Sequence, residues 1–150
     1  MSEKNLILEI KIDIFEDRIT GFEGKNGTVK MIPFGGSVSG KIFSGIVEPC
    51  GVDTQVTNLS QVRHMSARYM LTGKDYTGLA CRIYVENNGW FTDGAMPAPF
   101  KTVPTFITDS EALADYLGGS HFTGEGSRGE DGLVIRFYDK NPVDKSYVIL

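Results

Sequence analysis

An arginine at the centre of an alternating segment is the residue whose placement bears most directly on chemistry. Residues 64–73, HMSARYMLTG, alternate between polar and apolar side chains, which predicts a β-strand around Arg68. If Lys74 pairs with Leu79 across the following turn, the face that carries Arg68 is otherwise mainly apolar, with Met70, Cys81, Ile83 and Val85. We therefore expect Arg68 to point into the protein interior, although a slip of one residue would exchange the two faces.

A buried arginine must be paired, because a guanidinium keeps its proton in proteins. The nearest carboxylates along the chain are those of Asp53 and Glu48. One interpretation is a structural ion pair that closes one end of the fold. The other is a ligand site, in which Arg68 binds a carboxylate or enolate with two hydrogen bonds and stabilises negative charge on an oxygen.

Residues close to Arg68 supply candidates for proton transfer and for ligand contact. Asp53, His64 and Tyr69 are side chains that can donate or accept a proton, and we take them as candidate catalytic residues. In the alternative interpretation, His64 is an exposed residue near a strand end. Trp90 precedes the Gly- and Pro-containing loop 91–100. This loop is interpreted as a flexible lid or an interface, in which case Trp90 is a candidate for ligand contact. In the alternative interpretation, its aromatic residues only anchor the loop to the protein.

Two glycine-rich stretches approach phosphate-binding motifs and are rejected. Residues 35–42, GGSVSGKI, nearly match a P-loop, but Ile42 stands where the motif needs a hydroxyl and a strand follows where a helix is needed. Residues 124–129, GEGSRG, match the dinucleotide fingerprint but precede a strand, so we interpret them as a flexible loop. His64 and His121 have no His or Cys partner at ligand spacing, so neither a metal nor a cofactor is expected.

Alternation with a period of two dominates the chain and predicts an all-β fold. The expected strands span residues 6–14, 28–32, 41–47, 52–58, 64–71, 79–86, 100–107, 133–138 and 146–150. One short helix is expected near residues 109–117, after a capping box formed by Thr108 and Glu111. An antiparallel sheet of about eight or nine strands hides its edges best by closing into a barrel.

Composition limits the class of protein. The chain has 150 residues, which fits a single domain, 1–150, and its net charge is −4 without any cluster of Lys or Arg. Nucleic acid and acidic membrane surfaces are therefore not expected as partners. No signal-peptide core and no membrane-spanning run is present, so we expect a cytoplasmic protein. Apolar residues along 6–14 exceed what a small barrel would cover, which favours a homodimer.

Four stretches of the chain carry a family resemblance: GGSVSGKIFSGIVEPCGVDTQ, SARYMLTGKDYTGLACRIYVENNG, FKTVP and GLVIRFYD. Together they resemble the uncharacterised bacterial and fungal family known as domain of unknown function 3237, the UPF0311 group, over about residues 5–140. The resemblance implies a calycin- or lipocalin-like antiparallel β-barrel and no established activity. Its most specific residues are Asp53, Arg68 and Tyr69. The chain departs from the family pattern at Thr54, where a Trp is typical, and at Lys101, where an Arg is typical; Lys101 joins the ligand candidates.

Three classes of function follow from these observations. The first is an enzyme acting on a small carbonyl or carboxylate compound, with Arg68 at the oxyanion and Asp53, His64 or Tyr69 in proton transfer. The second is a non-catalytic barrel that binds a small amphipathic molecule. The third is a structural or oligomerising module with a filled core. An arginine inside the barrel would favour the first two classes, and we expect a small-molecule ligand in the lumen.

Overall fold

The computed structural model describes residues 5–94, 96–130 and 132–141. The expected strand at 146–150 lies outside them. The β-strands are β1 (Asn5–Ile14), β2 (Thr20–Gly24), β3 (Gly27–Ser39), β4 (Phe43–Thr57), β5 (Arg63–Asp75), β6 (Ala80–Phe91), β7 (Phe100–Thr108), β8 (Phe122–Gly129) and β9 (Gly132–Asp139). Two 3₁₀ turns, Glu16–Arg18 and Thr92–Gly94, and one α-helix, α1 (Ala114–Leu117), complete the described elements.

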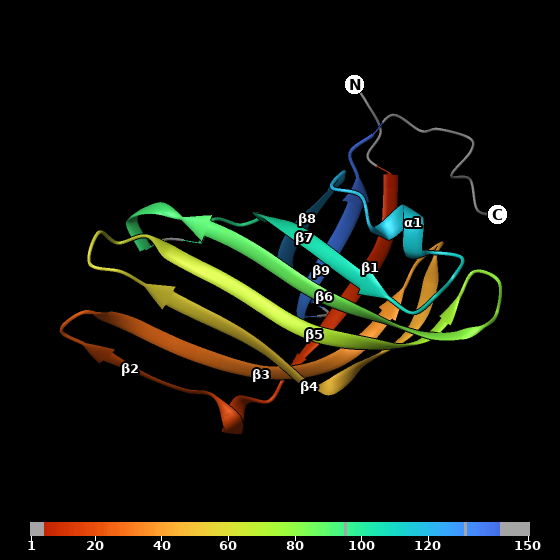
Figure 1. The fold of residues 1–150 in the computed structure, drawn as a ribbon. Helices are drawn as coiled ribbons and strands as arrows, with labels where there is room; N and C mark the ends of the chain where they lie inside the picture. Colours follow the sequence, from red (N-terminus) through yellow and green to blue (C-terminus); the bar gives the residue numbers. More distant parts are fainter. Residues whose placement is uncertain (1–4, 95, 131, 142–150) are drawn as a thin grey trace.

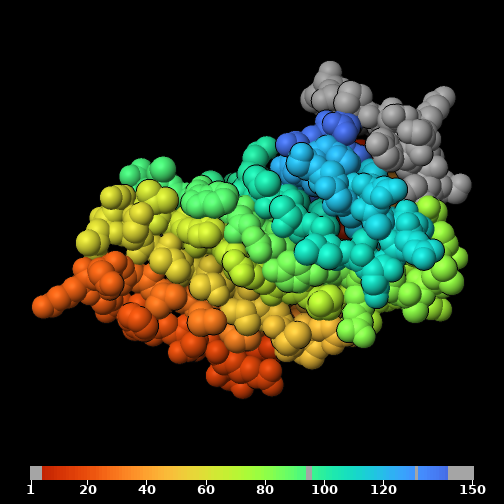
Figure 2. All heavy atoms as spheres, in the orientation of Figure 1, coloured from red at the N-terminus to blue at the C-terminus, as the bar shows by residue number. Residues whose placement is uncertain are grey.

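The strands form one antiparallel sheet that closes on itself (Figure 1). The order is β1-β9-β8-β7-β6-β5-β4-β3-β2, and β1 also pairs with β3, so eight strands make a barrel and β2 is an extra strand on the edge of β3. The hairpin of β2 and β3 projects from the body of the molecule (Figure 2). The expected all-β barrel with one short helix is confirmed.

Several expected boundaries were wrong in informative ways. Residues 41–47 and 52–58 belong to one continuous strand, β4, whose pairing with β5 shifts between Val47 and Val52. Such a bulge bends a strand without ending it, and Pro49, which has no N–H to donate, lies inside it. The segment 124–129, interpreted as a loop, forms most of β8, where Gly126 leaves room for the ring of Phe100.

The barrel is filled at the end that α1 covers. Phe106 packs edge-on against Phe122 and Phe137, with ring centroids 5.4 and 5.3 Å apart, and Tyr116 of α1 packs against Phe122. The helix is shorter than expected. Its first turn is bonded through Ser110, whose hydroxyl accepts the Leu113 N–H, so the expected cap at Thr108 and Glu111 was wrong.

The apolar residues of β1 are buried or half-buried within this chain. Ile7, Leu8 and Ile10 are fully buried, and a bulge between Leu6 and Leu8 turns two successive apolar side chains inward. The excess of apolar surface that favoured a homodimer is therefore absent from this strand, and the homodimer itself stays a prediction.

The register of the hairpin of β5 and β6 decides which side chains enter the barrel. The Asp75 N–H donates to the Leu79 carbonyl, and the turn is a three-residue loop, 76–78, that ends on Gly78 at a φ of +88°. Lys74 consequently pairs with Ala80, one residue beyond the expected partner Leu79. This slip turns the odd-numbered residues of β5 inward, together with Cys81, Ile83 and Val85 of β6.

Candidate functional site

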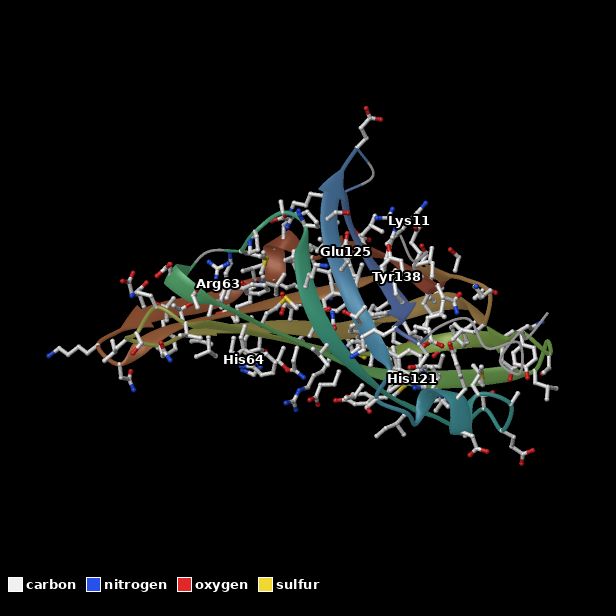
Figure 3. The ribbon with its side chains drawn as sticks, turned by 90° about the horizontal axis from the view of Figure 1, so that it is seen from above. Lys11, Arg63, His64, His121, Glu125 and Tyr138 are labelled. Carbon is white, nitrogen blue, oxygen red and sulfur yellow. The ribbon has the colours of Figure 1, made fainter. Side chains whose placement is uncertain are left out.

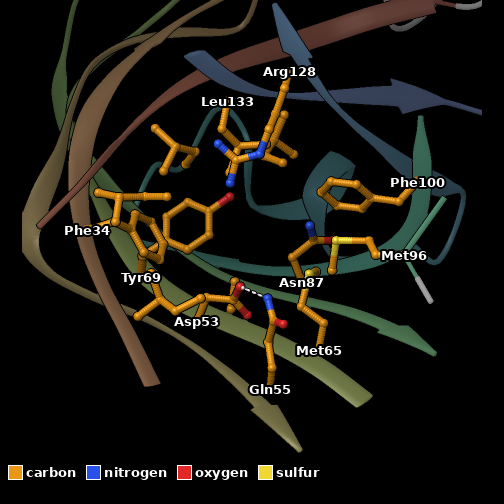
Figure 4. Close-up of a pocket in the computed structure, with 15 residues that line it drawn as sticks. Phe34, Asp53, Gln55, Met65, Tyr69, Asn87, Met96, Phe100, Arg128 and Leu133 are labelled. Carbon is orange, nitrogen blue, oxygen red and sulfur yellow. Dashed lines mark hydrogen bonds between the residues drawn. The ribbon is translucent and has the colours of Figure 1, made fainter. Parts of the chain in front are cut away.

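A cavity lies inside the barrel, and Figure 4 shows the residues that line it, none of which belongs to the aromatic cluster of Phe106, Tyr116, Phe122 and Phe137. Its volume is about 80 Å³, measured as the space that the centre of a water molecule can reach, which is well above the roughly 10–15 Å³ that one water needs. Most of its wall is apolar and comes from several strands, with Ile12, Ile32, Phe34, Met65, Phe100 and Leu133 among the contributors. Met96, from the loop between β6 and β7, also lines it.

Asp53 brings a carboxyl group to this apolar wall. It lies on β4 directly after the bulge and faces the cavity beside Gln55, whose Nε2 donates to Asp53 Oδ2 at 2.8 Å. The other oxygen, Oδ1, is buried and has no hydrogen-bond partner among the described residues. Burial raises the pKa of Asp53, against the opposing effects of the Gln55 bond and of the charge on Arg63.

Tyr69 brings a hydroxyl group to the same cavity from β5. Its side chain is 4% exposed, and its ring packs edge-on against Phe34 with centroids 5.1 Å apart. The hydroxyl is buried and finds no hydrogen-bond partner within the described part of the chain. Burial, and secondly the nearby carboxylate of Asp53, raise the pKa of Tyr69 far above its ordinary value, so the side chain is a neutral O–H donor.

Two further polar side chains face the cavity. Asn87 of β6 is 1% exposed, and its Oδ1 is likewise buried without a partner among the residues described. Arg128, near the end of β8, is exposed for much of its length, but its guanidinium points toward the Tyr69 hydroxyl across the cavity (Figure 4). Barrel closure thus places a cationic donor of β8 opposite a tyrosine of β5.

The arrangement is suited to an oxygen-bearing ligand with an apolar body. Tyr69 and Arg128 can donate hydrogen bonds to a carbonyl or oxyanion, while Asp53 Oδ1 can accept a proton or a hydrogen bond. The apolar wall strengthens each of these interactions by excluding water. Among the described residues, no group of three or more His, Cys, Asp and Glu side chains is placed to hold a metal ion.

The expectation that Arg68 points into the barrel was wrong. Its side chain is 62% exposed on the outer face of β5, where Nε lies 3.6 Å from Glu86 Oε1 and donates to Ser66 Oγ at 3.4 Å. The physical reason is the three-residue hairpin loop, which shifts the register of β5 by one residue. Arg68 therefore pairs with Glu86, and Val85, the expected partner of Arg68, pairs with Tyr69. Neither Asp53 nor Glu48 contacts Arg68, and the anion site built on it in the lumen is withdrawn.

The remaining sequence candidates also lie outside the cavity. His64 and Trp90 stack on each other on the outer face of the sheet with ring centroids 4.7 Å apart, and His64 Nε2 bonds to Asn88 Oδ1. Figure 3 shows His64 on the opposite side of the sheet from its neighbour Arg63. Glu48 is half-buried in the β4 bulge, and Lys101 is exposed on β7; neither lines the cavity.

Sequence reasoning therefore placed Asp53 and Tyr69 among the candidates and missed Gln55, Asn87 and Arg128. Gln55 carried a usable signal, since residues two apart on a strand share a face. Asn87 continues the alternation of Cys81, Ile83 and Val85 by one more step. Arg128 offered no such signal, because its segment was interpreted as a loop and β5, which carries Tyr69, is far away in the chain.

The family model and the sequence relative that match this chain carry no stated function. The family model described as "Protein of unknown function (DUF3237)" matches residues 4–140. A UPF0311 protein of Clostridium acetobutylicum is 29% identical over 147 residues, covering 88% of this chain and 90% of its own. No helix in the described residues has both the length and the apolar character needed to cross a membrane.

Solved structures similar to this chain have the same fold. A protein of unknown function from Clostridium acetobutylicum superposes with a TM-score of 0.70 at 30% identity and covers 91% of this chain and 97% of its own. A conserved protein of unknown function from Rhodopseudomonas palustris superposes with a TM-score of 0.66 at 27% identity, covering 91% and 96%. The barrel is thus shared with these proteins, and their descriptions name no ligand.

Proposed function

Since the chain belongs to the DUF3237 family of proteins of unknown function, we propose from its own site that it binds a small, largely apolar, carbonyl-bearing molecule in the barrel lumen. A carbonyl oxygen suits the two donors, Tyr69 and Arg128, that point toward each other across the cavity. A carboxylate suits the site less well, because the Asp53 carboxyl lines the same small space and would repel it when ionised.

One observation carries this proposal: Asp53 Oδ1, the Tyr69 hydroxyl and Asn87 Oδ1 are buried without hydrogen-bond partners among the described residues, and all three residues line one apolar cavity. Each unsatisfied buried polar group costs about 1–3 kcal/mol. A barrel selected only to be stable would replace these groups with apolar ones. A ligand that bonds to them supplies a reason to keep them.

The alternative of a filled structural barrel fits one half of the molecule only. The end beneath α1 is packed with aromatic rings, as that alternative requires. The other end keeps a cavity and holds its polar side chains on rigid strands, which is the form that small-molecule sites take. We therefore favour the binding proposal over a purely structural role.

Titration with two compact ketones, 2-indanone and 2-tetralone, tests the proposal. We expect saturable shifts in ¹H–¹⁵N NMR spectra, confined to residues that line the cavity. Ala67→Leu places a larger side chain in the lumen and should abolish these shifts, whereas Arg68→Met, on the outer face of the same strand, should leave them intact. Shifts that persist in Ala67→Leu, or that spread over the outer face, would contradict a lumen site.

A further inference from the structure

The Asp53 carboxyl and the Tyr69–Arg128 pair are suited to opposite halves of one reaction. We propose that the lumen is the active site of an isomerase that acts on a compact ketone with a β,γ double bond and moves a proton from the carbon next to the carbonyl group to the far carbon of that double bond. In this inference, which rests on the proposed binding function, Asp53 is the base, and Tyr69 and Arg128 hold the carbonyl oxygen.

The proposed reaction is balanced and needs no oxidant or other co-reactant. Asp53 Oδ1 takes a proton from the carbon next to the carbonyl, and the electron pair of the broken C–H bond moves to form an enolate. The negative charge collects on the oxygen that faces Tyr69 and Arg128. The β,γ double bond extends the enolate to a dienolate, and Asp53 returns the proton to its γ-carbon. The double bond then lies between the α- and β-carbons, the carboxylate is regenerated, and the product is the conjugated isomer of the ketone.

The surroundings of Asp53 are those of a base. Gln55 holds Oδ2 at 2.8 Å and so orients the carboxyl group, which leaves Oδ1 buried and without a partner in the described structure. Burial raises the pKa of Asp53, so this carboxylate accepts a proton more readily than an exposed one. The Gln55 hydrogen bond and the charge on Arg63 oppose this shift without cancelling it.

The surroundings of Tyr69 are those of a donor to a developing oxyanion. Its ring is fixed against Phe34, and its hydroxyl stays protonated because burial raises its pKa. The Arg128 guanidinium, which points to the same place, adds a permanent positive charge. An aspartate base combined with a tyrosine donor in an apolar pocket is an arrangement that enzymes use to isomerise ketones.

Arg68 and His64, the residues that sequence reasoning would have assigned to this chemistry, have no part in it. Both lie on the outer face of the barrel, where Arg68 contacts Glu86 and His64 contacts Trp90 and Asn88. Tyr69 therefore acts in the proposed reaction, whereas Arg68, its neighbour on the same strand, does not. Arg68→Met is the matched control.

Deuterium exchange tests the inference. With 2-indanone and 2-tetralone in D₂O, we expect the protein to accelerate the loss of the ¹H NMR signals of the protons next to the carbonyl. Asp53→Asn should slow this exchange by at least ~100-fold, the usual contribution of a general base. Tyr69→Phe should slow it by ~100-fold through loss of an oxyanion donor, and Arg68→Met should leave it unchanged. The rate should rise with pH around an inflection above 3.8, the ordinary value for Asp.

The outcomes separate this inference from the binding proposal. Ketones that bind in the lumen but exchange no faster than in buffer would overturn the isomerase and leave the binding function standing. Exchange that survives Asp53→Asn, with the variant folded as judged by circular dichroism, would also overturn it. The absence of saturable binding by either ketone would overturn both proposals together.

Discussion

Arg68 and Tyr69 are adjacent in the chain and lie on opposite faces of the barrel wall. The Tyr69 side chain is 4% exposed and lines the cavity, whereas the Arg68 side chain is 62% exposed and lies 3.6 Å from Glu86 on the outer face. Substitutions of the two residues should therefore change the free energy of unfolding by different amounts, and each change can be measured separately.

Arg68→Met should change stability little. An exposed ion pair contributes about 0–1 kcal/mol, because solvent screens the charges and the side chains lose entropy in pairing. Urea unfolding should therefore give a loss below ~1 kcal/mol, against about 3–5 kcal/mol for the core variant Phe137→Ala, whose side chain is fully buried. A loss above ~2 kcal/mol in Arg68→Met would mean that this arginine is buried after all.

Tyr69→Phe should be neutral or stabilising, because it removes a buried hydroxyl that has no hydrogen-bond partner among the described residues. Tyr116→Phe is the matched comparison, since the Tyr116 hydroxyl donates to Asp139 Oδ2 at 2.7 Å. Losing that bond to a charged acceptor should cost about 1.5–3 kcal/mol. Equal losses in the two variants, measured by urea unfolding, would show that the Tyr69 hydroxyl is bonded in the folded protein.

Asp53 should make the protein less stable as pH rises. Its folded pKa is raised by burial, so its contribution to stability is fully present below the unfolded value of about 3.8 and is lost as pH rises through the folded pKa. We expect the free energy of unfolding of Asp53→Asn to increase relative to that of the natural protein as pH rises from the unfolded to the folded pKa of Asp53. Above the folded pKa the difference should stay constant. A constant difference at every pH from 3 to 7 would contradict a raised pKa.

Asp75 should behave in the opposite way. Burial raises its pKa, but hydrogen bonds from Ser110 Oγ at 2.6 Å and from the Thr77 side chain and N–H outweigh this effect and lower the pKa overall. Its contribution is present above the unfolded value of about 3.8 and is lost as pH falls through the folded pKa. Asp75→Asn should cost about 2 kcal/mol near pH 7, with the cost disappearing in acid. A cost that is independent of pH would contradict this account.

Gly126→Ala should disturb the wall of the cavity. A Cβ at this position would lie 2.0 Å from Phe100 Cζ, so the ring of Phe100, which lines the cavity, must move. Overpacking of this kind costs about 1–3 kcal/mol, and we expect ketone binding to weaken as well. Gly129→Ala, on the same strand with no atom within 4 Å of the new Cβ, is the control and should stay within about 0.5 kcal/mol.

Sequence alone determined the class of fold and part of the candidate site. Alternation of side chains is a local property, so the positions of most strands and the all-β class could be predicted from it. Asp53 and Tyr69 could be selected as chemically capable residues, and both line the cavity. The glycine-rich segment 35–42 was rejected as a P-loop because it lacks the hydroxyl and the following helix, and the strand that was expected after it is present as β4.

Tertiary structure alone decided which side of each strand faces the lumen. On β5 the choice depends on a single residue of hairpin register, set by the three-residue loop after Asp75 and by the bond from Ser110 to the Asp75 carboxylate, a partner 35 residues away. The pairing of Tyr69 with Arg128 depends on barrel closure, which brings β8 across from β5. Alternation specifies two faces but not which is buried, and that choice depends on hairpin register and on long-range contacts, neither of which alternation shows.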